Sequence, residues 1–241
     1  MNAITTTNLT KQYGEVTAVD NLTLSVADGE LFALLGVNGA GKTTTIKMLS
    51  CLSKPTSGNA VLLGNDINKQ ARAIKPHINI SPQETAVAPN LTVAENLELV
   101  AGLYGQNRVT AKQSAIDIAA RFGLTSILRK KAKTLSGGMQ RRFGIAMALI
   151  SNPKILFLDE PTLGLDVLAR RELWASIQAL KGKVTIILTT HYLEEVEALA
   201  DRIGIMANGK LAAVGTLAEI TAQTDTHTLE DAFVALAGGA Q

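Results

Sequence analysis

The feature that most constrains this chain is a glycine-rich loop at residues 36–43, with the sequence Gly-Val-Asn-Gly-Ala-Gly-Lys-Thr. It matches G-x-x-x-x-G-K-[ST] at every fixed position, a pattern that holds phosphate when a strand precedes it and a helix follows it. The apolar run Leu31–Leu35 predicts a strand buried on both faces, and the helically spaced Ile46, Leu49 and Leu52 predict the helix. We therefore expect a strand, a phosphate-binding loop and a helix, in that order.

The residue types in this loop suit a nucleotide phosphate. Glycines let backbone N–H groups converge on phosphate oxygens, and the positive end of the next helix points to the same place. Lys42 can neutralise charge on the β- and γ-phosphates, and the Thr43 hydroxyl can join the ligands of Mg²⁺. The candidate binding residues are Gly36, Val37, Asn38, Gly39, Ala40, Gly41, Lys42, Thr43 and Thr44.

Polar residues also end the next two apolar strands of the pattern. Asp159 and Glu160 follow Ile155–Leu158, and His191 follows the run that begins at Val184. Acidic residues that simply end a strand are the alternative, but beside a phosphate loop a functional pair is favoured. We expect Asp159 to hold Mg²⁺ through water and Glu160 to polarise the water that attacks the γ-phosphate. His191 would lie near that phosphate, at the strand edge where α/β sheets bind ligands.

A second element of the anion-binding type lies at Leu135–Met139. Ser136 is a good N-cap, but a cap does not need Gly137 and Gly138 behind it, since glycine in a helix costs about 1 kcal/mol against alanine. The sequence holds neither a second phosphate loop nor a second acidic strand end. We therefore favour a site shared by two copies over two nucleotides on one chain. In a head-to-tail pair, Ser136–Met139 would face the partner's nucleotide.

The middle of the chain changes from an alternating strand–helix pattern to a run of predicted helices. The first begins with the capping box Thr92–Glu95, the second ends at Gly123, and the third stops at Asn152-Pro153. Two Asx-Gly pairs, Asp28-Gly29 and Asn208-Gly209, predict hairpin turns.

Composition limits the class of protein. The chain has 241 residues, 46% of them hydrophobic, and a formal charge of +2, which is unlike a dedicated nucleic-acid binder. Its mean hydropathy of +0.18 is high, yet no apolar run approaches the ~20 residues of a spanning helix. The N-terminus has no signal-peptide pattern, and the single Cys51 excludes an intramolecular disulfide. We expect a soluble, cytoplasmic protein with no nucleic-acid partner.

Together these motifs resemble the ATP-binding subunit of an ABC transporter. By this resemblance, residues 36–43 are the Walker A loop, Ile155–Asp159 the Walker B strand and Leu135–Met139 the signature loop. Glu160 resembles the catalytic glutamate and His191 the switch histidine. The remaining matches are Gln83, which would touch Mg²⁺ and the attacking water, Asp166 of the D-loop, and Tyr13, where an aromatic ring stacks on adenine.

Other segments are similar to one branch of that family, the ABC-2-type exporters of the daunorubicin-resistance kind. These are the Met139–Arg142 stretch, the Thr189–Glu195 stretch and the tail at Thr228–Phe233. Two residues depart from the common pattern. Val37 replaces a proline in the variable part of the Walker A loop, and Met139 replaces the signature glutamine.

The resemblance implies an α/β fold: a P-loop NTPase core with a mostly parallel sheet, an N-terminal antiparallel β subdomain and an inserted helical subdomain. The core would span residues 1–83 and 152–225, the helical subdomain 84–151 and the C-terminal tail 226–241.

The implied function is ATP hydrolysis. Two copies would sandwich two Mg-ATP and power efflux through separate polytopic subunits of an ABC-2-type permease, from the cytoplasmic face of the membrane. The helical subdomain would be the docking surface, with Gln83 as the hinge. The alternatives are an importer subunit, or a soluble ABC-type ATPase acting on nucleic acid or ribosomes. For the last, only the basic stretch Arg129–Lys133 offers a surface, and a solvated face explains it better.

Overall fold

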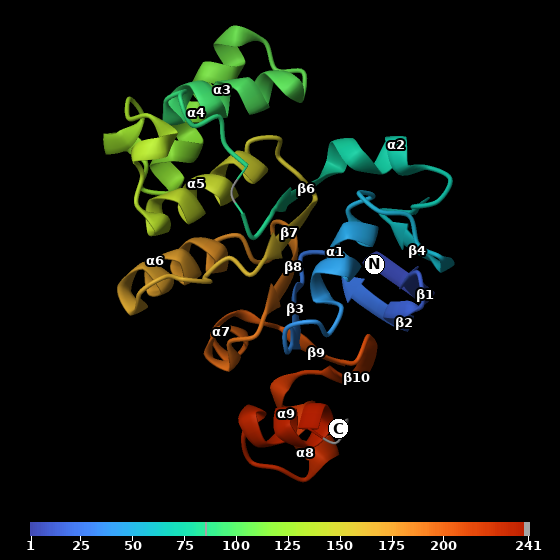
Figure 1. Cartoon of the computed structure of the whole chain (residues 1–241). Coiled ribbons are helices and arrows are strands. Elements are labelled where there is room, and N and C mark those ends of the chain that lie inside the picture. Colours follow the sequence, from blue (N-terminus) through green and yellow to red (C-terminus); the bar gives the residue numbers. More distant parts are fainter. Residues whose placement is uncertain (85, 239–241) are drawn as a thin grey trace.

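Two sheets form the framework of the computed structural model, which describes residues 1–84 and 86–238 (Figure 1). The larger sheet has the strand order β10-β9-β3-β8-β7-β6, parallel throughout except for the β9–β10 pair. Its strands are β3 (Leu31–Gly36), β6 (Ile78–Ser81), β7 (Ile155–Asp159), β8 (Thr185–Thr190), β9 (Arg202–Ala207) and β10 (Lys210–Gly215). The smaller, antiparallel sheet has the order β2-β1-β4-β5, with β1 (Asn2–Tyr13), β2 (Val16–Ala27), β4 (Ser57–Leu62) and β5 (Asn65–Asp66).

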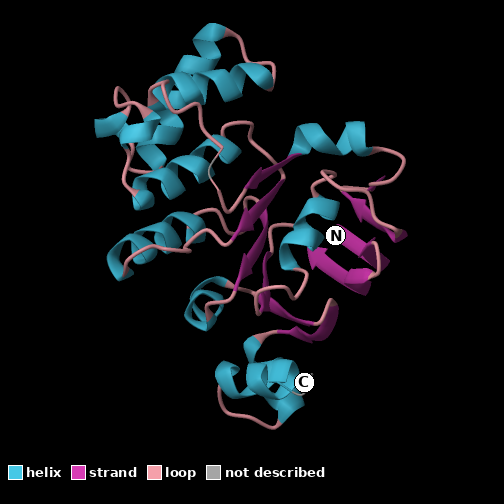
Figure 2. Cartoon of the chain, viewed as in Figure 1, coloured by secondary structure: helices cyan, strands magenta, loops and turns pink. Residues whose placement is uncertain are grey.

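The central strands of the larger sheet are buried along their whole length. Every residue of β3, β7 and β8 is buried, because helices cover one face, and α1 and the smaller sheet cover the other (Figure 2). Alternate residues point to opposite faces. Phe157 and Ile187 pack with α1 (Lys42–Leu49) and the smaller sheet, whereas Leu156 packs toward α6 (Val167–Gln178). The predicted mostly parallel, doubly covered sheet is confirmed.

Register then fixes where the polar residues meet. Leu35 of β3 lies opposite Thr190 of β8, and Asp159 of β7 lies opposite Thr189 of β8. Because these strands run in parallel, the loops that follow them all leave from the same edge of the sheet.

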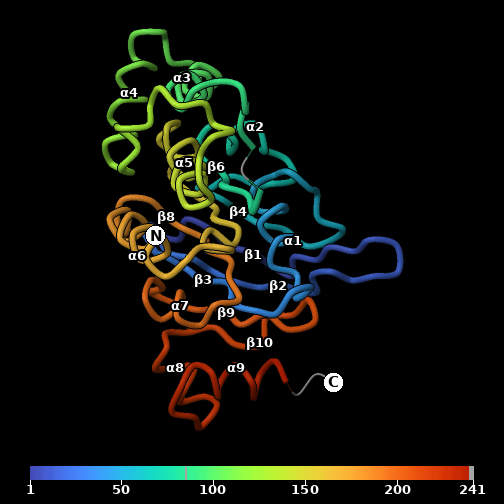
Figure 3. The backbone as a smooth tube through the Cα atoms, turned by 60° about the vertical axis from the view of Figure 1, so that its left-hand side comes forward, coloured from blue at the N-terminus to red at the C-terminus, as the bar shows by residue number. Residues whose placement is uncertain are grey.

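The helices between β6 and β7 gather at one end of the molecule, away from α8 (Leu217–Thr224) and α9 (Leu229–Gly238) at the other (Figure 3). They are α3 (Val93–Leu103), α4 (Arg108–Arg121) and α5 (Gly137–Leu149), and the short α2 (Ala71–Ile74) precedes β6. The predicted capping box of Thr92 and Glu95 is present, and Ser136 caps α5. The boundaries drawn for the helical subdomain and the tail stay predictions, and residues 239–241 lie outside the described part.

Two predicted local features differ from the structure. The Asp28-Gly29 turn forms but makes no hairpin, since β2 and β3 belong to different sheets. The turn is held instead by β8, where the Thr185 hydroxyl accepts from the Gly29 N–H group at 3.0 Å and donates to Asp28 at 3.3 Å. The helix after the phosphate loop ends at Leu49, because Cys51 is left-handed with φ 57°.

The other predicted hairpin is confirmed: β9 and β10 pair in antiparallel fashion around Asn208-Gly209. The part of the chain that the structure describes contains no helix of the length and apolarity needed to cross a membrane.

We expect the Phe157→Ala variant to lower the free energy of unfolding by about 3–5 kcal/mol, since it empties a fully buried site between the sheets. Urea denaturation measures this change. Val109→Ala, at a side chain that is 81% exposed, is the control and should stay within about 0.5 kcal/mol. Similar losses in the two variants would contradict this account of the core.

Candidate functional site

The phosphate loop joins the end of β3 to the start of α1, as the sequence predicts. Gly41 precedes the helix with φ 102°, a conformation that suits glycine. A Cβ atom at this position would lie 2.4 Å from the carbonyl oxygen of Ala18, so only glycine allows this close approach to β2. The loop glycine therefore also sets how tightly the smaller sheet packs against the loop.

Lys42 is buried at the base of this loop, with 5% of its surface exposed. Its ammonium group donates to the carbonyl oxygens of Gly36 at 2.7 Å and Val37 at 3.1 Å, and lies 3.5 Å from Oε1 of Glu160. Burial lowers the pKa of Lys42, and the negative charges of Glu160 and Asp159 oppose that shift. The loop thus holds a buried cation beside the space where a phosphate would bind.

Asp159 connects the loop to the neighbouring strands. Its Oδ1 atom accepts from the hydroxyls of Thr43 at 3.2 Å and Thr189 at 2.5 Å. The carboxylate is 4% exposed, so these two hydrogen bonds replace bonds that it would otherwise make with water. Thr189 was not among the predicted site residues, although its position at the end of an apolar strand, two residues before His191, was a usable signal.

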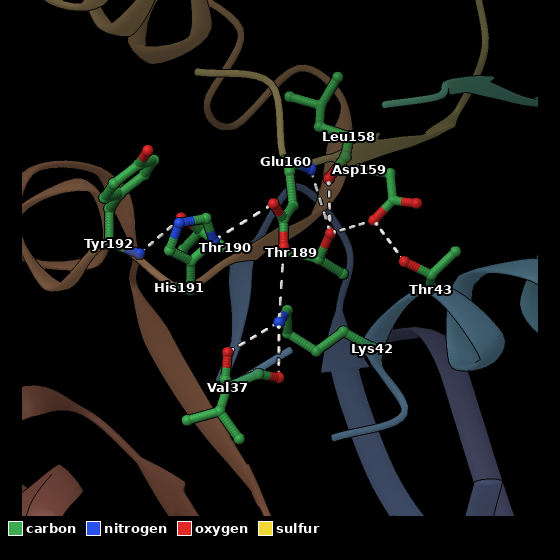
Figure 4. A network of polar contacts seen from close by, with 11 residues as sticks. Val37, Lys42, Thr43, Leu158, Asp159, Glu160, Thr189, Thr190, His191 and Tyr192 are labelled. Carbon is green, nitrogen blue, oxygen red and sulfur yellow. Dashed lines mark hydrogen bonds and ion pairs between the residues drawn. The ribbon is translucent and has the colours of Figure 1, made fainter. Parts of the chain in front are cut away.

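Glu160 lies between Lys42 and His191 (Figure 4). Its backbone is left-handed with φ 48°, an uncommon conformation for a residue with a side chain. The backbone N–H group is held by Thr189, with the carbonyl oxygen accepting at 3.0 Å and the hydroxyl at 3.2 Å. Its Oε2 lies 3.2 Å from Nδ1 of His191, at ion-pair distance but without hydrogen-bond alignment.

Lys42, Thr43, Glu160 and His191 line a cavity of about 410 Å³, whose lining does not include Asp159, Gly36, Val37 or Ala40. Of the predicted residues it brings together Asn38, Gly39, Gly41, Lys42, Thr43, Thr44, Gln83, Glu160 and His191. Ala18 of β2 and Leu163, which follows Glu160, also line it and were not predicted. Both are ordinary apolar residues in the sequence, and only the folding of the chain brings them to the cavity.

Other predicted site residues lie outside this cavity. Within the described chain, its lining includes none of Ser136–Met139, which start α5, nor Asp166, which caps α6 by accepting from the Ala169 N–H group at 2.9 Å. Gly138 faces Ala169, so the signature loop and the start of α6 lie side by side. Tyr13 ends β1, is 50% exposed and has the Lys11 ammonium 5.0 Å from its ring centre.

Gln83 is tied to the helices that follow it. Its carbonyl oxygen accepts from the guanidinium of Arg141 on α5. Burial lowers the pKa of Arg141, and the charge of Glu160 opposes this shift. The segment after β6 therefore lies between the cavity and α5.

Comparison with known proteins identifies the family. The model of the family described as ABC transporter matches residues 19–163. The linearmycin resistance ATP-binding protein LnrL of Bacillus subtilis is 41% identical over 92% of this chain and 72% of its own length. The daunorubicin resistance ATP-binding protein DrrA3 of Streptomyces coeruleorubidus is 42% identical over 92% of this chain and 71% of its own length.

Solved structures agree with this assignment. An ATP-binding subunit of an ABC transporter superposes with a TM-score of 0.87 at 30% identity, over 97% of this chain and 99% of that one. A dimeric, post-hydrolysis ATP-binding cassette, MJ0796 with ADP and Pi, gives 0.81 at 27% identity, over 89% and 98%. The chain therefore belongs to the ABC transporter family, as an ATPase similar to the ATP-binding subunits of its daunorubicin-resistance branch.

Proposed function

We propose that two copies of this ATPase close head-to-tail around two ATP molecules and thereby power export through separate membrane-spanning subunits. The observation that carries the proposal is the separation of two phosphate-binding elements. The Walker A loop, Glu160 and His191 line one cavity, whereas the helix start at Ser136 lies outside it. A second copy would bring its own Ser136–Met139 to this cavity and complete the site.

Within this site the side chains have separate roles. Lys42 exchanges the carbonyl oxygens of its own loop for phosphate oxygens, which carry more negative charge. Glu160 then loses a cationic neighbour and is available to orient and polarise the attacking water. His191, whose Nδ1 lies 3.2 Å from Oε2 of Glu160, would contact the γ-phosphate.

The donor set fits Mg²⁺. A carboxylate oxygen of Asp159 lies 3.2 Å from the hydroxyl of Thr43, which lines the cavity, and hard oxygen ligands are what this ion prefers. Thr43, Asp159 (through water) and Gln83 would hold the ion together with the phosphates. Bound there, Mg²⁺ supplies neutralisation of charge that develops on the β- and γ-phosphates.

The helices after Gln83 form the surface for the membrane partners. Arg141 on α5 contacts the Gln83 carbonyl, so a shift of this segment would reach both the cavity and the helices. A small apolar cavity of about 140 Å³ lies beside it, lined in part by Ile80, Pro82, Tyr104 and Met147. The drug resistance in the names of the relatives supports export. The membrane partner in this proposal is an ABC-2-type permease, contacted from the cytoplasmic face of the membrane.

We expect Thr189→Val to lower the rate of ATP turnover about tenfold and to raise the Mg²⁺ concentration needed for half-maximal activity. The change keeps the shape of the side chain but removes the hydroxyl that holds Asp159 and the N–H group of Glu160. Thr185→Val, the same change at the far end of the same buried strand, is the matched control. Equal turnover in the two variants would contradict the role of Thr189.

Sedimentation of the Glu160→Gln variant tests the dimer. With hydrolysis slowed, saturating Mg-ATP should convert the protein from monomer to dimer, and ADP should not. Adding Ser136→Arg to this variant should keep it monomeric, because the bulky arginine side chain then occupies the space where the partner's bound phosphate would lie. A Glu160→Gln protein that stays monomeric with saturating Mg-ATP would contradict the proposed dimer.

A further inference from the structure

One buried carboxyl group has no part in the site described above. Glu195 lies on α7 (Leu193–Leu199), four residues after His191, and is 0% exposed. A carboxyl is among the most costly groups to bury, unless donors replace the water that it loses. A hydrophobic side chain would fill the same space at lower cost, so the surroundings of Glu195 need an explanation.

Those surroundings consist of hydrogen-bond donors from separate parts of the chain. The indole N–H of Trp174, on α6, donates to Oε1 at 3.2 Å. The hydroxyls of Thr190 and Thr162, both 1% exposed, face the same carboxyl. Burial raises the pKa of Glu195, and these three donors and the charge of Arg170 oppose the rise. Among the described residues, the second oxygen, Oε2, and the Thr162 hydroxyl have no hydrogen-bond partner.

The donors belong to the segments that carry the proposed catalytic groups. Thr162 lies two residues after Glu160, in a turn closed by the Leu163 N–H group donating to the Glu160 carbonyl at 3.2 Å. Thr190 immediately precedes His191, and its hydroxyl oxygen accepts from the Tyr192 N–H group at 3.0 Å (Figure 4). The carboxyl thus joins α7 to α6 through Trp174, and the hydroxyls of Thr162 and Thr190 face the same group.

The chemistry of these donors favours an acceptor at this point. An indole N–H can only donate, and the Thr190 oxygen already accepts from the backbone, which leaves its hydrogen to donate. A carboxylate offers acceptors alone, whereas a glutamine of the same shape would place an NH₂ group against the hydroxyls. A change to glutamine therefore tests the hydrogen bonds without opening a cavity.

A second contact joins the same segments on the outside of this group. Arg170 of α6 lies 4.9 Å from the ring centre of Tyr192 and pairs with Glu194 at 3.3 Å. The segment that carries His191 therefore contacts α6 twice, through the buried Glu195 and through Arg170.

We propose that Glu195 is a positioning residue. By accepting from Trp174 it joins α7, which follows His191, to α6, which follows the turn after Glu160, and so fixes the distance between Glu160 and His191. This inference rests on the role proposed for His191. Glu195 itself is not among the residues that line the cavity. It acts through His191, and its effect belongs to the hydrolysis step rather than to nucleotide binding.

Steady-state ATPase kinetics of Glu195→Gln and Trp174→Phe test the inference. We expect kcat to fall about tenfold in Glu195→Gln and less in Trp174→Phe, with KM for ATP and the ATP dissociation constant within about twofold of the parent. The matched control is Glu197→Gln, an identical change at an exposed site on the same helix, which should leave kcat unchanged. Circular dichroism verifies folding; if Glu195→Gln does not fold, Trp174→Phe supplies the comparison.

Combination with His191→Ala separates this inference from the proposed function. If Glu195 acts through His191, then His191→Ala with Glu195→Gln should be no slower than His191→Ala alone. If the double variant is slower than His191→Ala, with the effects of the two changes multiplied, the role of Glu195 is overturned. An unchanged kcat in Glu195→Gln overturns it as well. Neither result affects the role of His191. Turnover at the parental rate in His191→Ala would overturn the role of His191 and this inference with it.

Discussion

The burial of three adjacent parallel strands on both faces is the constraint on which the rest of this structure depends. Strands β3, β8 and β7 have no exposed position, so groups that need water or ligands collect where the strands end. Their in-register pairing places those ends at one edge of the sheet. Polar groups therefore meet at this edge, since every position within the three strands is buried. They are the phosphate loop, the Asp159–Glu160 pair and His191.

At this edge the charges are arranged so that a bound phosphate would change their partners. Lys42 is shared between two carbonyl oxygens of its own loop and the carboxylate of Glu160. The same carboxylate lies beside His191, and its backbone is held in a left-handed conformation by Thr189. Drawing Lys42 toward phosphate would therefore free Glu160 for water, which links binding of the nucleotide to readiness for hydrolysis.

Much of the fold and of the cavity could be predicted because the relevant patterns are local. The glycine loop, the apolar runs and the caps at Thr92 and Ser136 involve neighbours in the sequence. What the sequence could not supply were contacts set by register and packing between distant segments. Thr189, Ala18 and Leu163 look ordinary until the sheet is assembled, and the Asp28-Gly29 turn depends on a strand more than 150 residues away. The burial of Glu195 is likewise a property of how α6 and α7 pack.

If each nucleotide site is built from two copies of the chain, mixing two inactive variants should restore ATP turnover. Lys42→Ala removes the cation of the phosphate loop, and Ser136→Arg blocks the signature loop. A mixed pair keeps one complete site, so an equal mixture should recover up to about a quarter of parental ATP turnover, since half of the pairs are mixed and each has one intact site. A mixture no more active than its separate components, or full activity in Ser136→Arg alone, would contradict the claim.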